Sequence, residues 1–158
     1  MNMDFTLYTL ARSLHVAAIV GWIGGVWFVT LVVMPAISRS ELPASRLAAF
    51  HQIEQGFSAQ AKFWVLLAGA SGFWMTHQAG LWSRFADSAY WWMHAMLALW
   101  LIFAAMLFVA EPLFLHRRMA GSPSPEVDFA RMVMVHRLLS ALALVTVLGA
   151  MAGAHGLI

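Results

Sequence analysis

The chain contains no cysteine and few charged residues. Of its 158 residues, 9 are basic and 7 are acidic, so charged residues make up 10% of the chain. Ordinary soluble domains carry about 25%. The absence of cysteine excludes disulfide bonds, thiolate metal sites and iron–sulfur clusters. A net charge of +2 gives no sign of a surface that binds nucleic acid, and we expect no such partner.

Hydrophobic residues are abundant instead, at 62% of the chain, and the mean hydropathy is +0.77. A helix needs about 20 mostly apolar residues to cross the hydrocarbon core of a bilayer. Four stretches reach about that length: Leu7–Met34, Phe63–Leu81, Tyr90–Leu115 and Met132–Ile158. They lack the two-residue alternation of membrane barrel strands. The sequence therefore predicts one all-α integral membrane domain, residues 1–158, surrounded by lipid.

The connections between these stretches predict how the helices are arranged. Short loops favour an antiparallel bundle of four transmembrane helices. The segment Ala44–Gln60 mixes apolar and polar residues at helical spacing, so we expect an amphipathic extension before helix two. Glycines four residues apart, such as Gly21 and Gly25 or Gly149 and Gly153, predict close contacts between helices.

The basic residues are divided unequally between the two faces of the predicted bundle. The face with both termini holds only Arg12 and Arg84. The opposite face holds seven: Arg39, Arg46, Lys62, Arg117, Arg118, Arg131 and Arg137. Because the richer face of a membrane protein usually lies in the cytoplasm, we expect both termini in the periplasm of a bacterial inner membrane.

Histidines near the ends of the apolar stretches are the main functional signal. Ionisable groups at membrane depth are costly and rarely persist without a partner or a role, and imidazole is the commonest metal ligand and the usual axial ligand of haem. Four histidines fall in the predicted outer half and two near the cytoplasmic face, and we take all six as candidate metal ligands: His15, His77, His94, His155, His136 and His51. A seventh, His116, precedes Arg117 and Arg118 and reads first as part of a basic cluster.

Depth along the helices predicts how the outer histidines pair. His15 and His94 lie at similar depth on helices one and three, which are diagonal neighbours in a four-helix bundle, so both could bind one iron. His77 and His155 form the other diagonal pair. Arg12 and Arg84 could hold haem propionates, or simply extend to the interface.

These residues leave three functions open. The favoured one is binding of haem b through histidines, with electron transfer between a membrane or periplasmic donor and an acceptor such as a quinone. The second is copper binding or transport by histidine with methionine, since thioether and imidazole suit Cu(I). The third is a membrane subunit whose histidines are structural. The sequence has no nucleophile–base pair or phosphate loop. Activity as a membrane haem oxidoreductase stays open, as does assembly into a homo-oligomer.

A short motif in the first stretch adds a resemblance. Leu14-His15 followed by Trp22-Ile23-Gly24-Gly25 resembles the first-helix signature of the CopD-like (copper resistance D) membrane domain family. It is similar, more loosely, to the HemJ-type protoporphyrinogen oxidase family. The first resemblance implies copper handling at the inner membrane, and the second implies haem binding and a porphyrinogen substrate. Both imply a functional role for His15 and, more weakly, for Trp22, Gly24 and Gly25.

Overall fold

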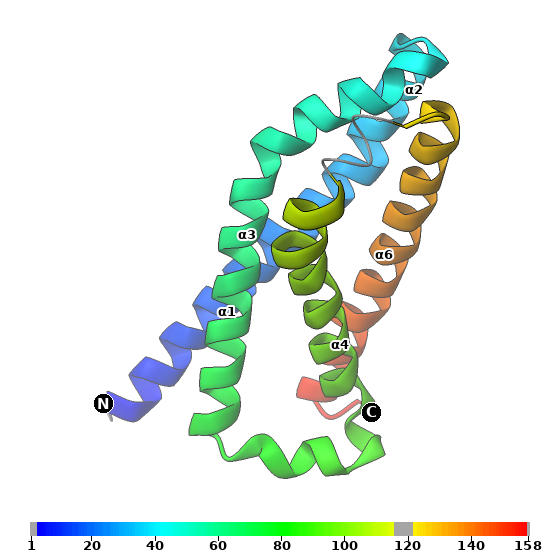
Figure 1. Cartoon of the computed structure of the whole chain (residues 1–158). Coiled ribbons are helices and arrows are strands. Elements are labelled where there is room, and N and C mark those ends of the chain that lie inside the picture. The colour runs from blue at the N-terminus through cyan, green and yellow to red at the C-terminus, as the bar shows by residue number, and fades with distance from the viewer. Residues whose placement is uncertain (1–2, 116–121, 158) are drawn as a thin grey trace.

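The computed structural model describes residues 3–115 and 122–157, and these residues contain helices and turns but no strand. The long helices reverse direction at each turn of the chain (Figure 1). Three helical segments are long and apolar enough to cross a membrane: Phe5–Ser40, Ser88–Leu113 and Pro125–Ala154. The all-helical character predicted from the sequence is thus confirmed, and three helical segments have the length and apolarity that a membrane span requires.

The first helical segment is continuous through Pro35. Helix α1 (Met3–Phe28) passes into a π-helical turn, η1 (Val29–Val33), and then into α2 (Met34–Ser40). Proline has no N–H for the regular helical bond and its ring crowds the preceding turn. The wider π turn directly before Pro35 accommodates this, and the Met34 N–H bonds to the Val29 carbonyl. The helical segment therefore continues past Met34, where the predicted stretch ends, and stops at Ser40.

Helix α3 (Arg46–Gln78) combines the expected amphipathic extension and helix two in one helix of 33 residues, about 50 Å long. It follows a short 3-10 turn, η2 (Pro43–Ser45). It stops before Gly80, whose φ of +64° is a conformation that glycine adopts readily. Lys62, which we expected on the cytoplasmic face between helices one and two, lies in the middle of this helix.

Helix α3 is not among the three candidate spans. The expected fourth span, Phe63–Leu81, is therefore not identified by length and apolarity, because polar and charged side chains occupy the first half of the helix. This half still contributes to the core, since Leu47 and Phe50 are buried there.

The second half of the chain returns through two more long helical segments. The 3-10 turns η3 (Leu81–Ala86) and η4 (Ser88–Tyr90) lead into α4 (Trp91–Ala105) and the π-helical η5 (Met106–Leu115). Pro112 lies inside η5, so it distorts this helix without ending it. Helix α6 (Pro125–Ala154) begins seven residues before the predicted start of the fourth stretch.

Aromatic rings pack onto glycines where the long helices meet. The Trp64 ring lies against Gly21, at 2.6 Å from where a Cβ would stand, and Phe57 lies against Gly25. In the same way Trp91 packs on Gly149 and Trp92 on Gly153. The predicted contact positions are therefore correct, and the partner at each glycine is a ring from a neighbouring helix.

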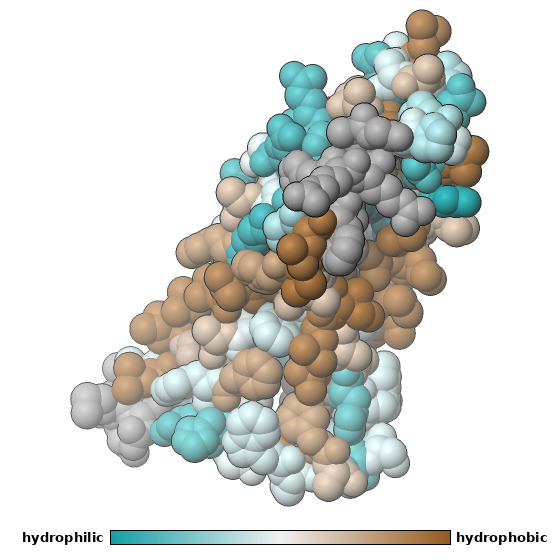
Figure 2. Space-filling model, in the orientation of Figure 1, coloured by the Kyte–Doolittle hydropathy of each residue, from teal (hydrophilic) through white to brown (hydrophobic). Residues whose placement is uncertain are grey.

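Hydrophobic side chains cover the middle of the face seen in Figure 2, and hydrophilic ones gather toward its two ends. Many large apolar side chains on the spans are exposed, including Leu31, Leu101 and Leu148. Polar links join the spans inside: the Trp27 indole donates to the Ser140 carbonyl at 3.2 Å, and the Thr30 and Ser140 hydroxyls are 2.9 Å apart. An apolar exterior around a bonded interior is the pattern expected in lipid.

Candidate functional site

His15 lies on α1 and its imidazole reaches α3. The ring is half-buried, and its Nδ1 is 3.0 Å from both the Ala68 carbonyl oxygen and the Ser71 hydroxyl oxygen. A carbonyl oxygen can only accept, so Nδ1 carries the hydrogen and Nε2 carries the lone pair. Among the described residues, nothing hydrogen-bonds to Nε2. This is the arrangement that a metal-binding histidine adopts, with one nitrogen fixed and the other available.

Small residues on α3 make this contact fit. The ring of His15 lies beside Gly72, where a Cβ would stand 3.1 Å from the imidazole Cε1. Ala68 and Ser71 are both buried. The Ser71 hydroxyl donates its single hydrogen to carbonyls of its own helix, those of Leu67 or Ala68. It therefore faces His15 as an acceptor.

His94 differs from His15 in both exposure and bonding. It is exposed on the first turn of α4, and both ring nitrogens face backbone carbonyls: Nδ1 is 3.2 Å from Tyr90 O and Nε2 is 3.0 Å from Phe85 O. The imidazole also packs edge-on against the Phe85 ring, at 5.6 Å between ring centroids. A neutral ring carries one hydrogen and donates to only one of these carbonyls, but both nitrogens lie against a carbonyl oxygen, which leaves neither open to a metal in this conformation.

The other two outer histidines lie at helix ends. His77 is exposed in the last turn of α3. His155 follows the last residue of α6, and its Nδ1 is 2.8 Å from the Met151 carbonyl oxygen. By the same argument as for His15, Nδ1 of His155 carries the hydrogen and Nε2 carries the lone pair.

The two arginines expected near a cofactor lie at the same end of the molecule. Arg12 is exposed on α1, one turn before His15. The Arg84 guanidinium lies over the ring of Tyr90, at 4.8 Å from its centroid. When the flat face of a guanidinium stacks on an aromatic ring, its N–H groups point outward in the plane of the group and can still donate hydrogen bonds.

His51 and His136 lie in the N-terminal halves of α3 and α6, whereas His77 and His155 lie at the C-terminal ends of these helices. His116 lies outside the described residues. His51 is 3.6 Å from Glu54 and its Nε2 is 3.1 Å from the Gln55 amide nitrogen. His136 is half-buried on α6, with Nδ1 at 3.0 Å from the Met132 carbonyl and its ring edge-on to Phe50.

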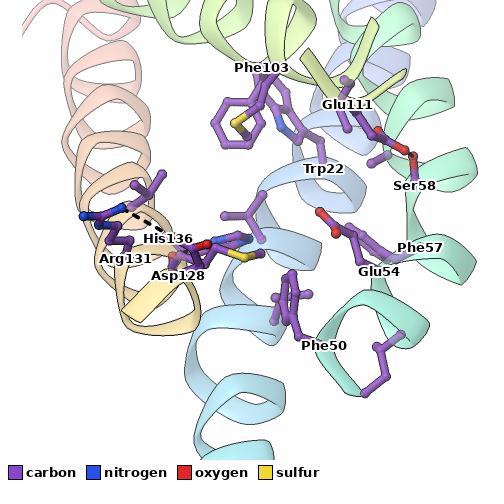
Figure 3. A pocket seen from close by; sticks show the side chains of 18 residues that line it. Trp22, Phe50, Glu54, Phe57, Ser58, Phe103, Glu111, Asp128, Arg131 and His136 are labelled. Carbon is purple, nitrogen blue, oxygen red and sulfur yellow. Dashed lines mark hydrogen bonds and ion pairs between the residues drawn. The ribbon is translucent and has the colours of Figure 1, made fainter. Parts of the chain in front are cut away.

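His136 also lines a cavity of about 480 Å³ that the sequence did not reveal. Figure 3 shows side chains from α1, α3, η5 and α6 around it. Rings and aliphatic chains form most of its wall, among them Trp22, Phe50, Phe57 and Phe103. Polar lining residues come from three elements: Glu54, Ser58, Glu111, Asp128, Arg131 and His136.

An ion pair that sequence analysis missed lies beside this cavity. Glu111 on η5 accepts from the Ser58 hydroxyl at 2.6 Å and from the Lys62 ammonium at 3.3 Å, both on α3. Arg117 and Arg118, the next basic residues along the chain, lie outside the described residues. The spacing of Ser58 and Lys62, four residues apart on one helix face, was the available signal.

In the part of the chain that the structure describes, no three histidine or carboxylate side chains converge as a metal-binding group. A haem with two axial ligands needs only a pair. Comparison with models of protein families, with curated proteins and with solved structures finds no match.

Proposed function

We propose that this chain is a multi-pass protein of the bacterial inner membrane, with α3 as a fourth membrane helix in an antiparallel bundle. The length of α3 exceeds the roughly 30 Å of the hydrocarbon core. Its mid-helix ammonium, Lys62, is paired with Glu111, which reduces the cost of placing both charges in the membrane. The uneven distribution of basic residues supports periplasmic termini.

Within that bundle, we propose that His15 is an axial ligand of a b-type haem and that the protein transfers electrons. The observation that carries this proposal is the His15 Nδ1 contact with the Ala68 carbonyl, because it leaves the lone pair on Nε2. Bound haem would supply one-electron oxidation and reduction at its iron. The chain would fix the His15 imidazole through α3, exclude water with its apolar helices, and provide Arg12 and Arg84 for the propionates.

The second ligand belongs to the same end of the molecule. The sequence favoured His94, which would have to give up its bond to the Phe85 carbonyl. His155 has Nδ1 already bonded to a carbonyl, and it follows α6, a helix that packs against α1. We therefore assign the second position to His155, with His77 as the next choice.

The test is an absorption spectrum of the purified, haem-supplied protein, followed by replacement of His15. Wild-type protein should give a Soret band and, when reduced, the sharp α and β bands of a six-coordinate centre. His15→Ala should lose them. The matched control is His51→Ala, because His51 lies 17 residues before Ala68 on α3, about 26 Å along the helix axis. Stoichiometric copper without haem in the wild-type protein would instead favour the copper function that the CopD-like resemblance implies.

A further inference from the structure

The cavity at the His136 end has walls suited to a flat, apolar molecule. Four aromatic side chains line it, and the Trp22 and Phe103 rings meet edge-on with centroids 5.1 Å apart. Phe50 meets both Phe129 and His136 edge-on, which fixes its orientation on the opposite side. At about 480 Å³, the space is in the range of pockets that bind small molecules.

One wall carries a hydrogen-bond donor that lacks an acceptor. Trp22 is only 3% exposed, and its Nε1 has no hydrogen-bond partner among the described residues. Buried tryptophans normally find an acceptor for this group. In Figure 3 the indole nitrogen of Trp22 lies on the side of the ring that faces the cavity. The nearby Phe103 ring could serve only as a weak π acceptor.

Another wall carries a free acceptor. The Nδ1 of His136 bonds to the Met132 carbonyl, so its Nε2 holds the lone pair, and no described residue bonds to it. A molecule in the cavity could therefore accept a hydrogen bond from Trp22 on α1. In a hydroxylated form it could also donate one to His136 on α6.

Three charged side chains of the lining, Glu111, Asp128 and Arg131, each pair with an opposite charge. Glu111 is bonded to Ser58 and Lys62. Asp128 accepts from Ser122 at 2.7 Å and pairs with Arg131 at 3.4 Å. Glu54 lies 3.6 Å from His51. Glu111, Asp128 and Arg131 thus each have an oppositely charged partner, and most of the cavity wall is apolar, so a neutral ligand fits better than an ionic one.

We propose that this cavity binds a neutral, lipophilic ring that carries a carbonyl oxygen, as in the head of a membrane quinone, with Trp22 donating to that oxygen. A hydrocarbon chain would fill the apolar space but would leave the indole N–H unpaired. This binding is independent of a haem at His15, so either proposal can fail without the other.

The experiment measures binding of a short-tailed benzoquinone, decylubiquinone, to the full-length protein in dodecyl maltoside by equilibrium dialysis against protein-free micelles. We expect saturable binding of one molecule per chain. Trp22→Phe keeps an aromatic ring and removes the donor, and it should weaken binding about 3- to 10-fold, the usual effect of one neutral hydrogen bond. The matched control is Trp82→Phe, because Trp82 is 50% exposed and lies outside the cavity.

A second ligand tests the proposal on wild-type protein alone. Decylbenzene has the tail and ring without oxygen, and it should bind more weakly than the quinone and equally to the wild type and Trp22→Phe. Equal binding of both ligands to the wild type, or unchanged quinone binding by Trp22→Phe, would overturn the proposal. An ester carbonyl of a phospholipid could also reach the indole. Loss of saturable quinone binding in dioleoylphosphatidylcholine nanodiscs would assign the cavity to lipid and equally overturn it.

Discussion

The two ends of this molecule use their polar residues differently. At the end with His15, each histidine is bonded separately: His15 to α3, His94 to η3, and His155 to its own helix. At the end with His136, polar side chains from α3, η5 and α6 converge on one cavity. The depth of the histidines along the sequence pointed to the first end, but side chains from different helices come together at the second. Depth along a helix thus identifies a layer, and a site also needs side chains that point toward one another.

The largest expected effect separates His155 from His94. If His155 is the second haem ligand, His155→Ala should convert the six-coordinate spectrum to a five-coordinate one or abolish haem binding. His94→Ala should keep the bands, since both of its nitrogens serve backbone carbonyls of η3 and η4. The measurement is the reduced-minus-oxidised absorption spectrum of each variant. Loss of the bands in His94→Ala alone would return the assignment to the diagonal pair predicted from the sequence.

The second effect tests how closely the His15 end is packed. A Cβ on Gly69 would stand 2.6 Å from the Trp100 ring, and the Trp100 indole is held by a 2.9 Å bond to the Val65 carbonyl. Gly69→Ala should therefore cost about 3 kcal/mol through overpacking. Thermal unfolding in detergent measures this. The control is Gly24→Ala, which has open space around it and should be neutral or slightly stabilising. Equal midpoints of thermal unfolding for the two variants would show that the Trp100 ring can move aside.

The third effect concerns the other end, where charge rather than packing is at stake. Lys62→Met leaves the Glu111 carboxylate, only 12% exposed, without its ammonium. We expect a loss of about 2 kcal/mol, below the 3–5 kcal/mol typical of fully buried pairs because Lys62 is partly exposed. The double variant Lys62→Met/Glu111→Leu should recover most of it in the same unfolding assay. If the double variant is as unstable as the single one, the aliphatic stem of Lys62 matters more than its charge.

The sequence predicted the features that depend on composition along one helix. These include the helical class, three of the four expected spans, and the glycine contact positions. It could not predict features that depend on rotation about a helix axis. His15 and His94 look equivalent in the sequence, and only packing makes one half-buried and leaves the other exposed. The Lys62–Glu111 pair joins residues 49 positions apart. The Trp22 N–H without an acceptor lies in a cavity between helices. The spacing of Ser58 and Lys62 marks one face of α3, but it does not identify Glu111 as the residue that this face meets.

The smallest expected effect tests what fixes the His15 ring. Ser71→Ala removes one of the two acceptors near Nδ1, and the Ala68 carbonyl remains. The hydrogen should stay on Nδ1, so haem binding should persist. The free energy of unfolding should fall by about 1 kcal/mol. Thr76→Ala is the matched control, because its hydroxyl donates to the Gly72 carbonyl of the same helix and, among the described residues, makes no hydrogen bond to a histidine. Midpoint and spectrum are measured together, since they separate two roles for Ser71. A lower midpoint with an unchanged spectrum means that Ala68 alone sets the tautomer of His15. Loss of the spectrum would mean that the hydroxyl holds the imidazole in place, and the ligand-ready state of His15 would then depend on a side chain rather than on the backbone of α3.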